Sequence, residues 1–447
     1  MTTDISGYKT HYAALARLGL PIIIGQVGVI VLNITDTLMV GQHSTDELAA
    51  AGFVNTVFML AVIIGLGFSY GLTAPVGSMF GRRELRRIGV LLKNGIAANL
   101  LMSAVIVAAM SVLYVNISRL GQPVELLPLM RPYFFVNMLS LPFMMVFNAF
   151  KQFADGITDT RAAMWMLLGG NALNILGNWL LIYGMFGLPE MGLLGAGVAT
   201  LLSRAVMAAA FAVMFALRKS YGVYRDSFVH GHVNRADLRT LTGMGVPLAV
   251  QMGMETVSFT LSSVMVGWLG AAALAAHQIT LAVSQLFYMV YYGMAAAVAI
   301  RVSYFYGQHD VAAMRCTSWA GLHIILVIAV CVSVPIFILR DVLGLWFTDS
   351  HEVSLLVSAL VWPLIVYQFG DCLQCIFANS LRGSAHVKPM MMIAIVAYVI
   401  IGLPLAYVFG FTLGGGIVGI WYSYTSELTV AGILYYICYR RRLQALS

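Results

Sequence analysis

Long apolar runs, broken by short polar segments, extend along almost the whole chain. A helix needs about 20 apolar residues to cross a bilayer. We therefore predict an all-α membrane protein with twelve membrane-spanning helices. The spans lie near residues 15–40, 52–76, 90–114, 130–152, 163–185, 193–216, 243–267, 277–300, 318–338, 354–378, 390–410 and 417–437.

The composition agrees with this pattern. Of the 447 residues, 60% are hydrophobic and 10% are charged, whereas a soluble protein carries about 25% charged residues. The mean hydropathy is +0.88. A net charge of +7 would suit a nucleic-acid partner in a soluble protein. Here the basic residues gather in polar segments on one side of the membrane, so we expect no nucleic-acid partner.

The basic residues also predict the orientation. With the N-terminus inside, the inner segments hold most of them, including Arg82, Arg83 and the run 440–442. The outer segments hold only Arg119, Arg131 and Arg340. Because cytoplasmic loops are enriched in Lys and Arg, both termini are expected in the cytoplasm.

The chain repeats itself at a shift of 226 positions. This shift carries Gly19-Leu20-Pro21 onto Gly245-Val246-Pro247, and Gly81 onto Gly307. One bundle of six spans has therefore been duplicated, and since six is even the two copies share an orientation. The predicted organisation is an N-terminal lobe over 1–217, a cytoplasmic linker over 218–240 and a C-terminal lobe over 241–447.

Three acidic residues lie deep in apolar runs: Asp36, Glu255 and Asp371. A carboxylate at the middle of a bilayer costs about 2.5–3.5 kcal/mol even on the lenient insertion scale. The repeat places Ser262 opposite Asp36 and Val29 opposite Glu255, so the scaffold itself does not need these acids. We expect them to serve function.

Glu255 and Asp371 are expected at one level of the membrane. Glu255 lies about 12 residues, or roughly 18 Å, from the inner end of its span, and Asp371 about 10 residues, or roughly 15 Å. Burial and mutual repulsion favour a shared proton, and the pair also suits Na⁺, a cation that prefers oxygen ligands. Tyr367 shares a face with Asp371, and Ser258 and Ser262 could add oxygens. The alternative is a pair of acids satisfied by hydroxyl groups.

The first half offers a second polar cluster. It comprises Asp36 with Asn33 beside it, Asn174 and Asn178 on one face of the fifth span, and Thr200 in the sixth. These residues line a cavity, or else they make hydrogen bonds between packed spans.

Other polar and aromatic residues leave two interpretations open. Tyr288 and Tyr292 line a pathway or pack in the core. Arg204 and Glu427, at nearly equivalent points of the repeat, have a structural role or contact the substrate. His277 and His323 are expected to be satisfied interior histidines.

Together these features resemble the multidrug and toxic compound extrusion (MATE) family, and within it the NorM branch. The resemblance covers essentially the whole chain and rests on the duplicated bundle, Asp36 in Asp36-Thr-Leu-Met-Val-Gly, Glu255, and Tyr367 with Asp371. It implies two six-helix lobes forming a V around a central cavity. It also implies cation coupling through Glu255 and Asp371, with Tyr367 nearby and Asp36 in a first-half site. A different branch carries an acid where this chain has Asn178, which shifts the weight to the second half.

The resemblance implies a secondary antiporter of the inner membrane, not an enzyme. It would export amphipathic, often cationic or aromatic compounds by alternating access, in exchange for Na⁺ or H⁺. We expect no cofactor and a monomer. A flippase for a lipid-linked precursor is one alternative, although only Arg204 supplies a deep basic group. An intramembrane hydrolase using Asp36 and Asp371 is another, although the estimated depths separate these acids.

Overall fold

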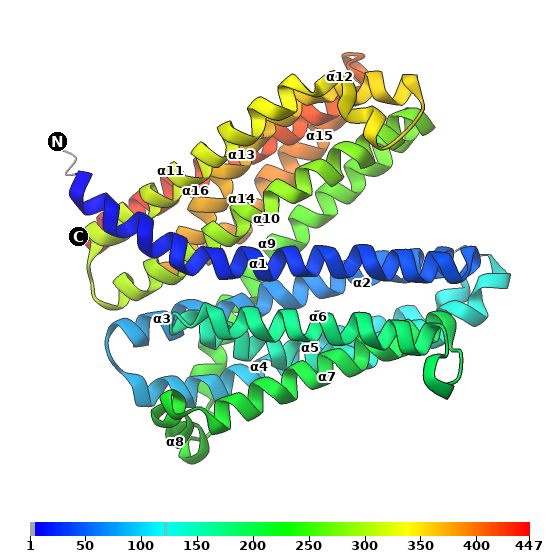
Figure 1. Cartoon of the computed structure of the whole chain (residues 1–447). Coiled ribbons are helices and arrows are strands. Elements are labelled where there is room, and N and C mark those ends of the chain that lie inside the picture. Colours follow the sequence, from blue (N-terminus) through cyan, green and yellow to red (C-terminus); the bar gives the residue numbers. More distant parts are fainter. Residues whose placement is uncertain (1–4, 120, 122) are drawn as a thin grey trace. The chain divides into compact units, whose positions relative to one another are not determined.

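The computed structural model describes residues 5–119, 121 and 123–447, and in these ranges the chain is helical with short turns (Figure 1). The first half contains α1 (Ile5–His43), α2 (Thr45–Ser69), α3 (Thr73–Gly81), α4 (Leu85–Val115), α5 (Leu127–Gly156), α6 (Thr160–Ile182) and α7 (Gly192–Leu217). The second half contains α9 (Arg235–Trp268), α10 (Ala271–Gly307), α11 (Val311–Ile338), α12 (Arg340–Leu343), α13 (His351–Gly383), α14 (Lys388–Ala394), α15 (Leu403–Tyr407) and α16 (Gly416–Leu446). The short helix α8 (Gly222–His230) lies between the halves.

Each of the twelve predicted spans coincides with a helical segment of the structure, which confirms the predicted fold class. Within the described residues, ten helices are long and apolar enough to cross a membrane. The two other long helices, α9 and α16, contain 34 and 31 residues. They carry Glu255 and Glu427, and such polar residues lower the hydropathy of a span without shortening it.

The eleventh predicted span departs from regular α-helix. Between α14 and α15 the chain forms a π-helix, η7 (Ile395–Gly402), and a second one, η8 (Val408–Thr412), follows α15. In a π-helix each carbonyl oxygen accepts from the amide of the fifth residue ahead, and such segments occur frequently at functional sites. We did not predict this departure from the sequence, although Pro404, which lacks a backbone N–H, follows η7 by two residues.

By internal contacts the chain forms two compact units. The C-unit comprises Met1–Ile23 with Val250–Ser447, and the N-unit comprises Ile24–Ala249. Both boundaries lie inside long helices, α1 and α9, just beyond Pro21 and Pro247. The lobes and linker stated above divide the chain at other points, and they stay a prediction.

The backbone repeats where the sequence repeats. Helices α3 and α10 end at Gly81 and Gly307, which are related by the shift of 226. Two residues beyond each, Arg83 and His309 both adopt the left-handed conformation, with φ of 62° and 59°. That conformation is uncommon for residues other than glycine. Its recurrence at matched positions confirms the duplication.

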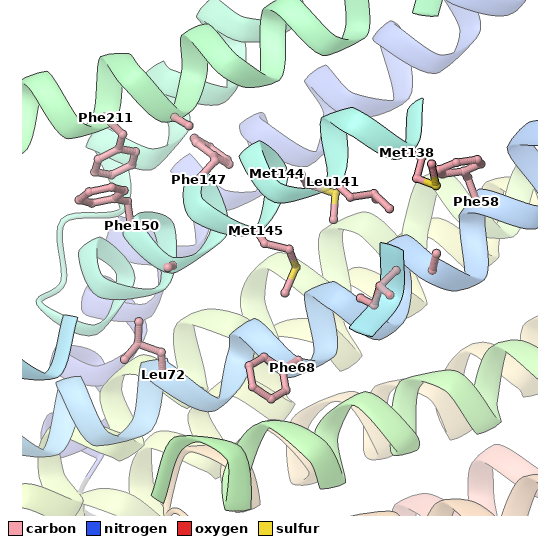
Figure 2. Packing of buried hydrophobic residues seen from close by; sticks show 14 of the residues in the cluster. Phe58, Phe68, Leu72, Met138, Leu141, Met144, Met145, Phe147, Phe150 and Phe211 are labelled. Carbon is pink, nitrogen blue, oxygen red and sulfur yellow. The ribbon is translucent and has the colours of Figure 1, made fainter. Parts of the chain in front are cut away.

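Helix α5 supplies much of the core of the N-unit (Figure 2). Its Phe147 and Phe150 pack against Phe211 of α7, and the Phe150 and Phe211 rings stack with centroids 5.5 Å apart. On another side, Met145 fills the space beside Gly65 of α2. Because lipid tails are as apolar as these side chains, close van der Waals packing holds such spans together.

The predicted linker 218–240 is folded onto the N-unit. Lys93 Nζ of α4 donates to the Gly231 carbonyl at 2.8 Å, and the Asn234 amide donates to Asn94 Oδ1 at 2.8 Å. Helix α8 approaches α4 so closely that a Cβ on Gly89 would lie 2.0 Å from the Tyr224 carbonyl oxygen. Glycine at position 89 therefore lets the two helices meet.

Asp159, just before α6, binds both the start of α6 and the first residues of the segment 218–240. One carboxylate oxygen accepts from the Ala162 amide at the start of α6. The other accepts from Arg218 at 2.6 Å and from the Tyr221 hydroxyl at 2.7 Å. Burial, together with the Asp159 carboxylate, raises the pKa of Tyr221. The phenol therefore remains a hydrogen-bond donor across the physiological range.

Candidate functional site

Glu255 and Asp371 come together inside the C-unit. Glu255 lies near the middle of α9, and Asp371 lies in the second half of α13, which packs between α10 and α16. Asp371 is 2% exposed and Glu255 is partly buried. The two carboxyl groups are near enough for the charge of one to act on the other.

Two glutamine amides hold Glu255 in place. Gln251, one turn earlier on α9, donates from Nε2 to Glu255 Oε2 at 3.1 Å. Gln374 on α13 donates to Oε1 and Oε2 at 3.3 and 3.4 Å, and to the Tyr398 hydroxyl at 2.8 Å. The carboxyl group of α9 is therefore tied to α13 and to the π-helical segment η7.

Asp371 has weaker polar neighbours. The Cys375 thiol, one turn later, donates to Asp371 Oδ1 at 3.4 Å. Among the residues that the structure describes, the hydrogen-bond donors to Glu255 and Asp371 are amides and this thiol, and neither acid forms a salt bridge with Lys or Arg. Within the described residues, the pair thus has no fixed positive partner.

Aromatic side chains surround the pair. Tyr367 is buried one turn before Asp371, shares a hydrogen bond with Ser284 of α10, and lies edge-on to Trp421 with centroids 5.8 Å apart. Tyr288 lies close enough to Glu255 and Asp371 to interact with both electrostatically, and its ring centroid lies 6.1 Å from that of Tyr292. The structure therefore places Tyr288 beside the acids.

Ser258 and Ser262 lie elsewhere than expected. Ser258 contacts the Tyr398 carbonyl oxygen at 3.1 Å and Glu427 Oε2 at 3.2 Å. Ser262 is buried and lies near Tyr424 of α16. The two serines lie about one and two helical turns beyond Glu255, where α9 faces α16 rather than the acid pair.

The polar cluster of the first half forms a chain of hydrogen bonds inside the N-unit. Asn178 Nδ2 of α6 donates to Asp36 Oδ1 of α1 at 2.5 Å and to Asn174 Oδ1 at 3.1 Å. Asn174 in turn donates to Thr200 and Ser203 of α7, each at 3.2 Å. Asp36 is thereby linked to two further helices.

Asn33 and Arg204 lie near the polar cluster of the N-unit but make different contacts. Asn33 is exposed and lies outside this chain of hydrogen bonds. Arg204 donates to the Ser140 hydroxyl at 2.7 Å, and its charge acts on Asp36. Asp36 thus has a cation nearby, whereas Glu255 and Asp371, among the described residues, have no salt bridge with Lys or Arg.

The interior histidine prediction is confirmed for His277. Its Nε2 pairs with the Ser263 hydroxyl at 2.8 Å, and the Trp421 indole donates to its Nδ1 at 3.2 Å. For His323 the interior prediction is wrong: the residue is exposed, and its Nδ1 pairs with the Tyr12 hydroxyl at 2.9 Å.

Sequence reasoning missed the residues that orient Glu255. Gln251 and Gln374 follow from helical spacing, because one lies four residues before Glu255 and the other three residues after Asp371. Tyr398 has no such signal, since it reaches the site from a distant helix.

Comparison with known proteins agrees with this architecture. The chain is 29% identical over 426 residues to a probable multidrug resistance protein NorM of Photorhabdus laumondii, covering 94% of each chain. It is 27% identical over 438 residues to a multidrug resistance protein NorM of Aliivibrio fischeri, covering 96% of this chain and 94% of that protein.

Solved structures share the fold. A transporter of the MOP superfamily from Pyrococcus furiosus superposes with a TM-score of 0.87 at 20% identity, over 100% of this chain and 99% of the other. A MATE transporter of Vibrio cholerae gives a TM-score of 0.87 at 16% identity, over 98% of each.

The MatE family model matches residues 21–180 and 247–408. The two stretches begin at Pro21 and Pro247, the same positions that the internal repeat relates. The matched residues make up more than half of the sequence, and the chain therefore belongs to the MatE family.

Proposed function

We propose that this protein is a cation-coupled multidrug efflux antiporter of the cell inner membrane, with both termini in the cytoplasm. The names of the NorM relatives support the export of drugs. One observation carries the coupling: Glu255 and Asp371 lie together inside the C-unit, with hydrogen bonds from amides and a thiol. Ionised carboxylates inside a membrane are unfavourable unless a positively charged partner binds them.

The coupling ion is H⁺ or Na⁺. A proton would be shared by the two carboxyl groups, since like charges this close disfavour ionisation of both. Na⁺ would be held by Glu255 and Asp371, with the amide oxygens of Gln251 and Gln374 turned toward it and the Tyr367 ring nearby. Either cation drives export only if it binds the inward-facing and outward-facing conformations unequally.

The substrates are amphipathic compounds, often cationic or aromatic. The rings of Tyr288 and Tyr292 supply faces for such molecules, and the same acids that take the coupling ion can take a cationic drug. Competition between drug and ion for one pair of carboxylates makes the exchange obligatory. Asp36, Asn174, Asn178 and Thr200 form a first-half site with an auxiliary part in coupling or substrate binding.

We further infer that the protein acts as a monomer, without a cofactor and not as an enzyme. The flippase and the hydrolase are the competing functions. A hydrolase would need Asp36 and Asp371 to act as a pair. Asp36 instead has its hydrogen-bond partner within the N-unit, and Asp371 has its partner within the C-unit.

Reconstituted vesicles test the proposal. Dye efflux is followed with a Na⁺ gradient and a pH gradient imposed separately, for wild type, Asp371→Asn, Glu255→Gln and a control, Glu352→Gln. Glu352 is an exposed acid on the same helix as Asp371.

We expect one gradient to drive export by wild type and by the control, and neither variant of the pair to respond although both insert normally. Export by Asp371→Asn at the wild-type rate would contradict the coupling role. Lipid scrambling or peptide cleavage without dye movement would favour the flippase or the hydrolase.

A further inference from the structure

A third acid lies buried in the C-unit. Glu427 of α16 is 1% exposed. Its Oε2 packs against the backbone of Gly402, the last residue of η7, where an added Cβ would lie 1.8 Å from that oxygen. Its Oε1 is buried and, among the described residues, without a hydrogen-bond partner. An ionised carboxylate in this place would lack most of the hydrogen bonds it requires.

Among the residues that the structure describes, none supplies Glu427 with a compensating positive charge. The titratable groups that interact electrostatically with Glu427 are Glu255 on α9, Tyr398 on η7 and Tyr424 on α16 itself. Glu255 is negative when ionised and neutral when protonated, and tyrosines are neutral at physiological pH, so none of these groups is positive. Burying a lone charge among such groups is far more costly than burying a neutral acid.

Counting hydrogens gives an independent argument. Ser258 Oγ lies 3.1 Å from the Tyr398 carbonyl oxygen and 3.2 Å from Glu427 Oε2. A serine hydroxyl has one hydrogen, and a carbonyl oxygen can only accept. If the hydroxyl donates to Tyr398, Glu427 must donate to the hydroxyl. Both contacts are full hydrogen bonds only when Oε2 carries a proton.

From this geometry we propose that Glu427 is a proton-binding site, separate from Glu255 and Asp371, that carries a proton on Oε2 in this conformation. The neutral carboxyl group donates to Ser258, which donates to Tyr398. The proton thereby joins the π-helix η7 to α9 and α16.

The new site is connected to the first pair through one residue. The Tyr398 carbonyl accepts from Ser258, which also contacts Glu427. The Tyr398 hydroxyl accepts from Gln374, which also binds Glu255. A shift of η7 would alter both ends of this connection. The relevance of the connection to transport rests on the function proposed above, whereas the protonation of Glu427 does not.

Infrared spectroscopy of the purified protein in lipid at neutral pH tests the protonation directly. We expect the carbonyl stretching band of one carboxylic acid to be lost in Glu427→Gln and retained in Glu255→Gln and Glu352→Gln. In Ser258→Ala the band should shift to higher frequency, because the carboxyl group loses its acceptor. Loss of a carboxylate band, with the acid bands intact, in Glu427→Gln would overturn the proposal.

A second measurement covers the case of a poorly folded variant. The folded protein would hold a proton that the unfolded chain releases at neutral pH. The unfolding constant of wild type should therefore rise with pH by up to about tenfold per unit relative to Glu427→Gln. Parallel pH profiles for the two proteins would overturn the proposal. Because neither readout requires transport, a failure of drug export would leave this result standing.

Discussion

Gln374 of α13 donates from its amide nitrogen to both carboxylate oxygens of Glu255 on α9, at 3.3 and 3.4 Å. Gln374 lies one helical turn beyond Asp371, so a single face of α13 carries one acid of the pair and the amide that positions the other. The site is therefore built across two helices, and a movement of either helix changes the distance between the acids.

Removal of this amide should impair export. In Gln374→Met the side chain keeps its length but loses its hydrogen-bond donor, and a hydrogen bond to a charged group contributes about 1.5–3 kcal/mol. We expect the rate of ion-driven efflux from vesicles to fall by about tenfold or more. Gln278→Met, at an exposed position of α10, should leave it unchanged. Equal rates for the two variants would show that Gln374 does not position Glu255.

A second acid beside Asp36 should make stability depend on pH. Asn178 Nδ2 donates to Asp36 Oδ1 at 2.5 Å, so Asn178→Asp places two carboxyl groups in contact. Two carboxyl groups so close must share a proton. The folded variant then binds a proton that the unfolded chain releases as the pH rises.

We therefore expect Asn178→Asp to lose stability with rising pH, relative to wild type, by at most about 1.4 kcal/mol per pH unit. Thermal unfolding in detergent at several pH values measures this slope. Asn178→Leu, which removes the donor without adding an acid, should lack the extra slope. A pH profile of Asn178→Asp parallel to that of wild type would contradict the predicted contact.

The fold followed from the sequence because its signals are strong and repeated. Apolar length predicts each span, and the shift from Pro21 to Pro247 predicts the duplication. The cost of a buried charge led to Glu255 and Asp371. Neutral polar residues such as Gln374 carry no comparable signal, since an amide within a membrane helix has many possible partners.

Details set by contacts between helices lay beyond sequence reasoning. Ser258 shares a face with Glu255 on an ideal helix, yet it bonds to Glu427 because α16 packs there. Pro404 follows η7 by two residues, but a proline in a helical run does not by itself distinguish a π-helix from a kink. For Tyr288 the sequence favoured core packing over a pathway, and its proximity to both acids depends on how α10 packs in the C-unit.

Gly402 should leave room for the buried carboxyl group of Glu427 beside η7. A Cβ at this position would lie 1.8 Å from Glu427 Oε2, whereas a Cβ on Gly267 meets no atom within 4 Å. Overpacking a well-packed interior costs about 1–3 kcal/mol. Thermal unfolding should therefore show that Gly402→Ala is destabilised by about this amount, while Gly267→Ala is not. Similar melting temperatures for the two variants would contradict a tight contact between Gly402 and the Glu427 carboxyl group.

The segment after α7 should loosen when its anchor is removed. Asp159 caps α6 and accepts from Arg218 and Tyr221, and loss of a helix cap alone costs about 0.5–2 kcal/mol. We expect Asp159→Ala to increase the rate of limited proteolysis within 218–240. Asp226→Ala, in α8, serves as the control because Asp226 lies in the same segment but outside this contact. Equal cleavage rates for the two variants would argue against the anchor.

The central claim is that Glu255 and Asp371 bind the cation whose entry drives export. The most direct measurement reverses the experiment: a drug gradient alone is imposed across vesicles, and Na⁺ and H⁺ movements are recorded. We predict that drug flowing one way drives one of these cations the other way in wild type and in Glu352→Gln, and that Glu255→Gln and Asp371→Asn abolish this counterflow. Cation counterflow that persists in both variants of the pair would contradict the account.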